Sequence, residues 1–230
     1  MAQLPLALAL ADHASFETFV GGGNATAVEH VRSLAHGATD TVWLWGADGA
    51  GKTHLLQAVC REATAAGRRA MYVALPAVSP EMLSGLEHID VLAVDDVQTV
   101  AGDAAWEQAL FVILNAFSSR SGALLLAASA PASQCGFRLA DLKSRGAGAV
   151  TYRLAALDDA ERAQALRLHA AARGLALEGA VADFLLARVA RDMSALTSWL
   201  ARLDRASLTA QRKLTIPFIR ELMARTDAGE

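Results

Sequence analysis

The sequence predicts an α/β domain built on a parallel sheet, followed by a small all-helical domain. Three observations predict this fold class. Short, nearly all-apolar runs alternate with helical patterns, as they do where parallel strands are buried on both faces. A glycine-rich loop of the pattern G-x-x-x-x-G-K-T joins the first apolar run to a helical segment. After Leu154 only helical patterns follow, so we expect the second domain to begin close to this residue.

The first domain is predicted from its apolar runs and the segments between them. The runs are expected to form strands at residues 41–45, 70–75, 91–94 and 123–128. Apolar residues recur at helical spacing after Lys52 and over residues 106–117, which predicts helices there. Alternating strands and helices of this kind form a doubly wound sheet with helices on both faces.

The second domain is predicted from helix start and stop signals. Asp158 and Glu161 form a capping box that opens its first helix. This helix is expected to end near Arg173, because Gly174 supplies a left-handed stop. Further helices are expected at residues 180–189, at 193–208 and from Pro217 onward, where a proline suits the first turn.

Composition excludes several classes of protein. The 230 residues are 53% hydrophobic and 20% charged, with a formal net charge of −3 and no basic stripe, so direct sequence-specific DNA binding is not expected. No uncharged apolar stretch reaches the roughly 18 residues that a membrane span needs. Cys60 and Cys135 lack metal-ligand spacing, which argues against zinc and fits free thiols in the cytoplasm. The apolar N-terminus lacks the Lys or Arg of an export signal.

The loop from Gly46 to Thr53 is the strongest functional signal. Its glycines allow backbone N–H groups to converge on a phosphate, and the N-terminus of the following helix adds the positive end of its dipole. Lys52 is expected to bridge the β- and γ-phosphates of a nucleotide, and the Thr53 hydroxyl to bind Mg²⁺. The loop residues predicted to bind nucleotide are Gly46, Gly49, Gly51, Lys52, Thr53 and His54.

Two carboxylates follow the third apolar run. Asp95 and Asp96 are expected at the carboxyl edge of the sheet, where ligands of such folds bind. Asp95 is the predicted Mg²⁺ carboxylate, and Asp96 is predicted to orient a hydrolytic water. Ser129, after the fourth run, is a candidate sensor of the γ-phosphate, and a plain turn serine before Pro131 is the alternative.

Arg145 lies past the fourth apolar run and is a candidate arginine finger. Such a residue projects to a neighbour's nucleotide and stabilises the charge that develops on the transferred phosphoryl group. The alternative is a solvated surface arginine, which is the commoner fate of a single Arg.

Several motifs together resemble the AAA+ core of the DnaA family of replication initiators. In chain order they are FETFV at 16–20, GN at 23–24, the loop at 46–53, VDDVQ at 94–98 and LKSR at 142–145. The resemblance covers almost the whole chain. It implies a core that holds ADP or ATP with Mg²⁺, with the following residues near the adenine: Phe19, Val20 and Asn24.

Two terminal segments extend the resemblance to the Hda family, the regulatory inactivators of DnaA. QLPLAL at residues 3–8 is similar to that family's sliding-clamp-binding peptide, and QRKLTIPF at 211–218 to its C-terminal signature. An extended tail with Gln3 for polar contacts and Leu6 and Leu8 for a pocket suits a peptide ligand. A Leu-rich terminus without a partner is the alternative.

The resemblance also implies partners, and it contains one departure. It implies that Arg145 acts on ATP held by a DnaA partner and that the sliding clamp of DNA polymerase III is the second partner. DnaA-like proteins carry a nucleotide-sensing lid arginine where this chain has Ser194. Arg191, nearly one helical turn earlier on the same face, either replaces that sensor or is a surface arginine. Loss of the sensor fits a regulator better than a motor.

Together these features predict a clamp-binding tail at residues 1–11, an AAA+ domain at 12–155 and a helical lid at 156–230. We expect a negative regulator of replication initiation that promotes hydrolysis of DnaA-bound ATP together with the DNA-loaded clamp. The alternatives are an ATP-hydrolysing enzyme or loader and a DnaA-like adaptor. Because the sequence ends at Glu230, directly after the lid, no helix-turn-helix domain is expected. Weak self-association is expected without a fixed symmetry.

Overall fold

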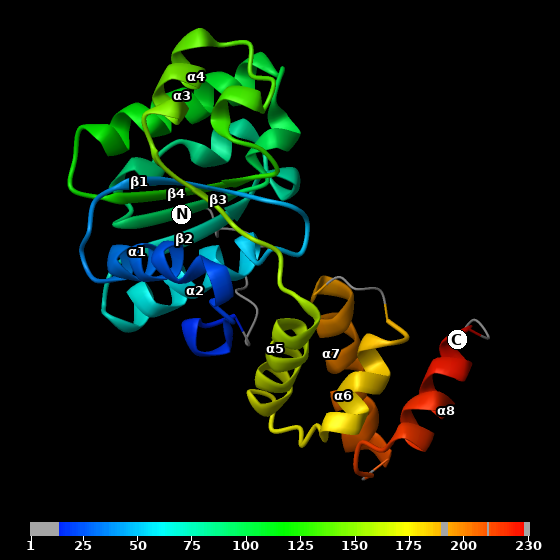
Figure 1. Cartoon of the computed structure of the whole chain (residues 1–230). Helices are drawn as coiled ribbons and strands as arrows, with labels where there is room; N and C mark the ends of the chain where they lie inside the picture. Colours follow the sequence, from blue (N-terminus) through cyan, green and yellow to red (C-terminus); the bar gives the residue numbers. More distant parts are fainter. Residues whose placement is uncertain (1–13, 190–192, 211, 228–230) are drawn as a thin grey trace. The chain divides into compact units, whose positions relative to one another are not determined.

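The computed structural model describes residues 14–189, 193–210 and 212–227. The chain forms two compact units, Met1–Ala156 and Leu157–Glu230, which we call the base and the lid (Figure 1). Each unit has its own hydrophobic core, so each is described by itself.

The base is built on a five-stranded parallel sheet with the order β2-β3-β4-β1-β5. The strands are β1 (Thr41–Trp45), β2 (Ala70–Ala74), β3 (Val91–Asp95), β4 (Ala123–Ala128) and β5 (Val150–Arg153). The predicted α/β fold class with a parallel sheet is confirmed. The edge strand β5 is an addition to the strands expected from the sequence.

Helices cover both faces of this sheet (Figure 1). One face carries α1 (Ala25–Ala35) and α2 (Lys52–Ala65), and the other carries α3 (Ala104–Ser118) and α4 (Ala140–Ala147). Short 3₁₀ helices form parts of the connections: Phe16–Thr18, Gly22–Asn24, Leu75–Ala77, Pro80–Leu83, Leu86–His88, Val97–Val100 and Ala132–Gln134.

The central strands are apolar because the side chains of each strand pack into two hydrophobic cores, one on each face of the sheet. Side chains alternate across a strand, so Val42 and Leu44 of β1 pack beneath α1 and α2, while Trp43 packs on the side of α3 and α4. All three side chains are almost completely buried. Leu55 and Leu56 of α2 meet the first of these cores, which fixes the helix that follows the glycine-rich loop against the sheet.

The lid is an all-helical unit, as the sequence predicted. Its helices are α5 (Asp159–Ala171), α6 (Gly179–Leu186), α7 (Met193–Ala210) and α8 (Ile216–Asp227). The predicted capping box is present, since Asp158 accepts a hydrogen bond from the backbone of Glu161 and the Glu161 side chain accepts one in return. Gly174 has the expected left-handed backbone, with φ of 72°. Leu166, Leu200 and Ile219 are fully buried in the lid core.

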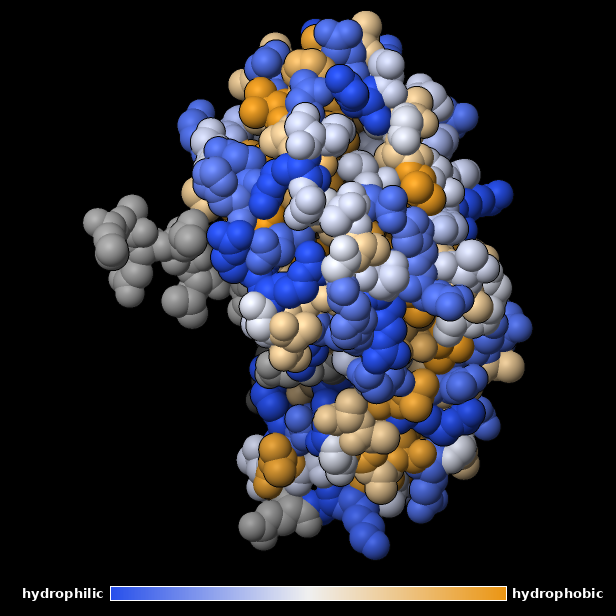
Figure 2. Space-filling view, turned by 90° about the vertical axis from the view of Figure 1, so that its left-hand side faces the viewer, coloured by the Kyte–Doolittle hydropathy of each residue, from blue (hydrophilic) through white to orange (hydrophobic). Residues whose placement is uncertain are grey.

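Figure 2 shows polar and apolar side chains interspersed on the face in view. Among the described residues, the large apolar side chains that are exposed are Val112, Val150 and Leu208, which lie on three different elements. No helix in the described ranges has the length and apolar character needed to cross a membrane.

Candidate functional site

The glycine-rich loop connects β1 to α2, and its glycines allow close backbone approaches. Gly49 and Gly51 have φ of 75° and 93°, a region that glycine enters without the strain that a Cβ atom brings. Gly46 is buried, and a Cβ atom added there would lie 2.7 Å from the backbone oxygen of Leu154. A Cβ atom on Gly51 would meet the ring of Phe19 at 2.6 Å. The segments that contain Phe19 and Leu154 therefore leave no room for a side chain at Gly51 and Gly46.

Lys52 opens α2 and lies within the loop that precedes it. Its side chain is only 8% exposed, and its Nζ donates to the backbone oxygens of Gly46 at 2.8 Å and Ala47 at 2.9 Å. The first N–H groups of an α-helix have no partner within the helix and carry the positive end of its dipole. An ammonium group, a helix N-terminus and two glycines with positive φ thus belong to one short loop, and this combination fits a phosphate group.

Asp95 ends β3 and is 1% exposed. Its carboxylate accepts hydrogen bonds from the Tyr72 hydroxyl at 3.0 Å, the Asp96 backbone at 2.9 Å and the Thr53 hydroxyl. Burial raises the pKa of Asp95, and the negative charge of Asp96 raises it further, whereas the hydrogen bonds lower it by less. A bound cation would stabilise the ionised form of this carboxylate. Adjacent carboxylates beside a threonine hydroxyl fit Mg²⁺, which proteins hold with one or two carboxylates and substrate phosphates.

Asp96, Gln98 and Ser129 are linked at the carboxyl edge of the sheet. Asp96 has φ of 57° and is the one non-glycine residue in the described ranges with a positive φ. The Gln98 amide donates to Asp96 Oδ1 at 3.3 Å, and its oxygen accepts from the Ser129 backbone at 3.0 Å. Gln98 therefore joins the end of β3 to the end of β4. Non-glycine residues with a positive φ, such as Asp96, are strained and cluster at functional sites.

The segment before α1 packs against the first turn of α2. The centroids of the Phe19 and His54 rings are 5.4 Å apart. Val20, the residue that follows Phe19, is buried. His54 Nε2 is 2.7 Å from the backbone oxygen of Ser15, and burial lowers the pKa of His54. Of the residues predicted to lie near the adenine, Phe19 therefore lies beside the glycine-rich loop at Gly51 and beside the first turn of α2 at His54.

Asn24 holds the chain at the end of the base. It is 4% exposed, its side-chain amide donates to the backbone oxygen of Ala155 at 3.1 Å, and its oxygen accepts from the Ala155 backbone at 2.8 Å. The resemblance to DnaA implies a position near the adenine for this residue, and that stays a prediction. The structure shows that its side chain fixes the segment after β5.

Replacing Asn24 by Ala is expected to lower the free energy of unfolding of the base by about 1–2 kcal/mol, because both hydrogen bonds to Ala155 are lost. Urea denaturation followed by circular dichroism measures this loss. The control is Thr26→Ala, which truncates an exposed residue two positions later in the chain and should stay within about 0.5 kcal/mol of the parent. Equal stability of the two variants would contradict the clamping role.

Arg145 lies on α4, a helix that is tightly packed on its inner side. The Arg145 side chain is exposed, whereas Leu142 and Gly146 of the same helix are buried. A Cβ atom added to Gly146 would lie 2.8 Å from Ala132, so this face of α4 leaves no room for movement toward the core. The structure therefore presents Arg145 to solvent on a fixed helix. Ser129 is also exposed.

Four of the predicted site residues lie outside the described residues. They are Gln3, Leu6 and Leu8 of the tail and Arg191 of the lid. Their roles stay predictions. Two residues at the site were not predicted from the sequence. Tyr72 lies within an apolar strand pattern, which gives no sign that its hydroxyl contacts Asp95. Gln98 lies in the VDDVQ motif but was assigned no role.

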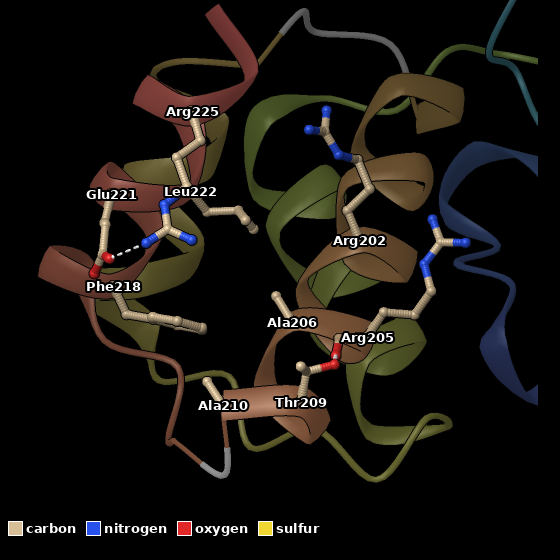
Figure 3. A pocket seen from close by; sticks show the side chains of 9 residues that line it. All are labelled: Arg202, Arg205, Ala206, Thr209, Ala210, Phe218, Glu221, Leu222 and Arg225. Carbon is tan, nitrogen blue, oxygen red and sulfur yellow. Dashed lines mark hydrogen bonds and ion pairs between the residues drawn. The ribbon is translucent and has the colours of Figure 1, made fainter. Parts of the chain in front are cut away.

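The lid contains a cavity of about 430 Å³ between α7 and α8 (Figure 3). Phe218 and Leu222 line it together with several arginines. Arg225 donates to Glu221 at 2.8 Å, and Arg202 stacks 4.3 Å from the Trp199 ring, so these two cations already have partners within the lid. None of the predicted site residues within the described ranges lines this cavity.

Comparison with known proteins gives two family matches. The bacterial DnaA ATPase domain matches residues 10–151, and the Hda lid domain matches residues 159–223. Domain III of the Thermotoga maritima replication initiation protein DnaA has a TM-score of 0.77 at 22% identity, covering 91% of this chain and 95% of that chain.

Two further solved structures are similar. AMPPCP-bound DnaA from Aquifex aeolicus has a TM-score of 0.68 at 25% identity, covering 84% of this chain and 66% of its own. The Thermotoga maritima RuvB Holliday junction branch migration motor has a TM-score of 0.62 at 19% identity, covering 89% of this chain and 67% of its own, which supports the fold alone. Since the DnaA match spans more than half of its residues, this chain belongs to the family of the bacterial DnaA ATPase domain, and its lid is of the Hda type.

Proposed function

We propose that this chain is a negative regulator of replication initiation that promotes hydrolysis of the ATP bound to a DnaA partner. The observation that carries this proposal is the position of Arg145, exposed on a helix whose inner face is close-packed. An arginine held in this way is suited to enter a site on another molecule, because little conformational freedom of the helix has to be lost on contact.

The chain's own nucleotide is ADP or ATP with Mg²⁺ in this proposal. Lys52 and the loop glycines hold the phosphates, and Thr53 and Asp95 hold the metal ion. The family likeness supports this assignment, since the similar DnaA from Aquifex aeolicus binds the nucleotide analogue AMPPCP. Bound nucleotide would set the conformation in which the chain meets its partner.

In the partner's site, Arg145 would supply a positive charge to the phosphoryl group during transfer. Arginine fingers of this kind raise hydrolysis by about three to five orders of magnitude in well-studied systems. The tail at residues 1–11 would bind the DNA-loaded sliding clamp of DNA polymerase III, and this second contact would raise the local concentration of the chain near DnaA. Both contacts together would confine the activity to DNA that is being replicated.

The proposal is tested by the hydrolysis of radiolabelled ATP bound to DnaA, with this chain, with clamp-loaded DNA, and with both. We expect rapid hydrolysis only when both are present. Replacing Gln3 by Ala should lower the rate at limiting protein by about tenfold, because one binding contact is lost, and a high protein concentration should restore it. The control is Gln134→Ala, which truncates an exposed glutamine far from the tail in sequence. No stimulation by the parent chain would sink the proposal.

The second candidate function is an ATP-hydrolysing enzyme or loader. It is supported by the two hydrogen bonds of Gln98, which link Asp96, the residue predicted to orient a hydrolytic water, to Ser129, the candidate γ-phosphate sensor. Multiple turnovers of ATP by the chain alone would support it. Slow release of ADP with negligible turnover would favour the regulator, and stable association with DnaA without any effect on hydrolysis would favour an adaptor.

A further inference from the structure

Glu107 is a buried carboxylate away from the nucleotide-binding loop. It lies in the first part of α3, four residues after the N-cap Asp103, and is 2% exposed. An ionised carboxylate is costly to bury unless it is fully hydrogen-bonded or paired. Its partners therefore indicate why the chain places it there.

The partners of Glu107 are three backbone N–H groups in two segments outside the helix. Gly102 donates to Oε1 at 2.7 Å, and Leu139 donates to Oε2 at 2.6 Å. Arg138 donates to both oxygens, each at 2.9 Å. Burial alone raises the pKa of Glu107, but these N–H groups lower it by more, so the pKa lies below its ordinary value and the carboxylate is ionised at neutral pH.

These hydrogen bonds fix the start of α4. Leu139 is the N-cap residue of α4, and Arg138 precedes it directly. Further along the same helix, Leu142 is buried in the core and Gly146 packs against Ala132. The helix is thus held at its N-cap by the carboxylate and along its inner side by apolar packing. The orientation of its exposed residues follows from these two restraints.

We propose that Glu107 is the positioning residue for Arg145. It acts through α4 and touches no nucleotide. By fixing the start of α4, its carboxylate sets the direction in which the Arg145 guanidinium group projects from the surface of the base. This inference rests on the proposed function, because it assigns to Arg145 the role of a finger in the partner's site. A misplacement of about 1 Å at a reacting group can cost about a hundredfold in rate, so a small rotation of α4 is enough to matter.

The test uses the full chain with DnaA, ATP and clamp-loaded DNA. Glu107→Gln keeps the shape of the side chain but replaces one acceptor oxygen by an NH₂ group that faces backbone N–H donors. We expect the maximal rate of stimulated hydrolysis to fall by at least about tenfold. The protein concentration for half-maximal stimulation and the affinity for ADP should stay within about twofold of the parent, which a general loss of structure would not allow. The matched control is Asp141→Asn, which removes an exposed carboxylate from the first turn of α4 itself and should leave the rate unchanged.

Four outcomes of this test decide whether Glu107 positions Arg145. A lower maximal rate with unchanged ADP affinity supports the positioning role. Parent-like stimulation by Glu107→Gln, while Arg145→Ala is inactive, overturns this inference and leaves the proposed function standing. A parallel loss of hydrolysis and ADP affinity assigns Glu107 a purely structural role and also overturns the inference. If the parent chain does not stimulate at all, the proposed function fails and this inference fails with it.

A second measurement needs no variant and covers the case in which Glu107→Gln does not fold. Hydrogen exchange of the parent chain should show protected amides at Gly102, Arg138 and Leu139, although none of them lies within a helix or strand. Exchange at the rate of an open loop would show that the carboxylate does not hold this segment, and would overturn the inference.

Discussion

Replacing Arg145 by Ala is expected to reduce clamp-dependent hydrolysis of DnaA-bound ATP by about three orders of magnitude. The charge that develops on the transferred phosphoryl group then has no cation from this chain to stabilise it. Because the side chain is exposed, the free energy of unfolding should change by no more than about 0.5 kcal/mol. Single-turnover hydrolysis with preformed DnaA–ATP measures the rate directly.

The matched control for Arg145 is Lys143→Ala. This variant removes one exposed positive charge from the same helix and should keep at least about half of the parent rate. A similar loss in both variants would mean that α4 contributes overall positive charge without a specific finger. Full activity of Arg145→Ala would favour the adaptor function, because an adaptor has no use for a catalytic arginine.

Replacing Lys52 by Ala is expected to weaken ADP binding by about a hundredfold or more. Hydrogen bonds to a charged group contribute about 1.5–3 kcal/mol each, and 1.4 kcal/mol corresponds to a factor of ten in the dissociation constant. The same change leaves the backbone oxygens of Gly46 and Ala47 without their donor in the nucleotide-free loop. Titration with a fluorescent ADP analogue, checked by calorimetry, measures the affinity.

Asp48→Ala is the control for Lys52. Asp48 is exposed in the same loop, and its Oδ1 lies 4.0 Å from the Lys52 ammonium. Because the loss of a nearby negative charge favours phosphate, this variant should bind ADP as tightly as the parent or slightly more tightly. Parent-like affinity of Lys52→Ala would contradict a phosphate-binding role for the loop.

The parts of the fold that were predictable are those with strong local patterns. The strands β1, β3 and β4 are continuous apolar runs, because both of their faces are buried. The edge strand β5 escaped prediction for the opposite reason. Val150, Thr151 and Arg153 are exposed, so this strand lacks an apolar run, and it is held by pairing with β1 on one side.

The same distinction applies to the candidate site. The loop that includes Lys52 was predictable because its function depends on spacing within eight consecutive residues. The most distant contacts of Gln98, Asn24 and Glu107 join residues that are 31, 131 and 32 positions apart. Pairings of this kind depend on how the strands and helices are packed in three dimensions, and no local pattern in one sequence reveals them.

The neighbours of β1 have a consequence for synthesis of the chain. β1 is complete at Trp45, but its two partners, β4 and β5, leave the ribosome about 80 and 105 residues later. The backbone oxygen of Leu154 also packs against Gly46, so the glycine-rich loop gains this neighbour only after β5 has been made. Contacts between such distant residues form slowly. A nascent chain arrested before residue 150 should therefore be unable to retain nucleotide, whereas one extended through the lid should retain it.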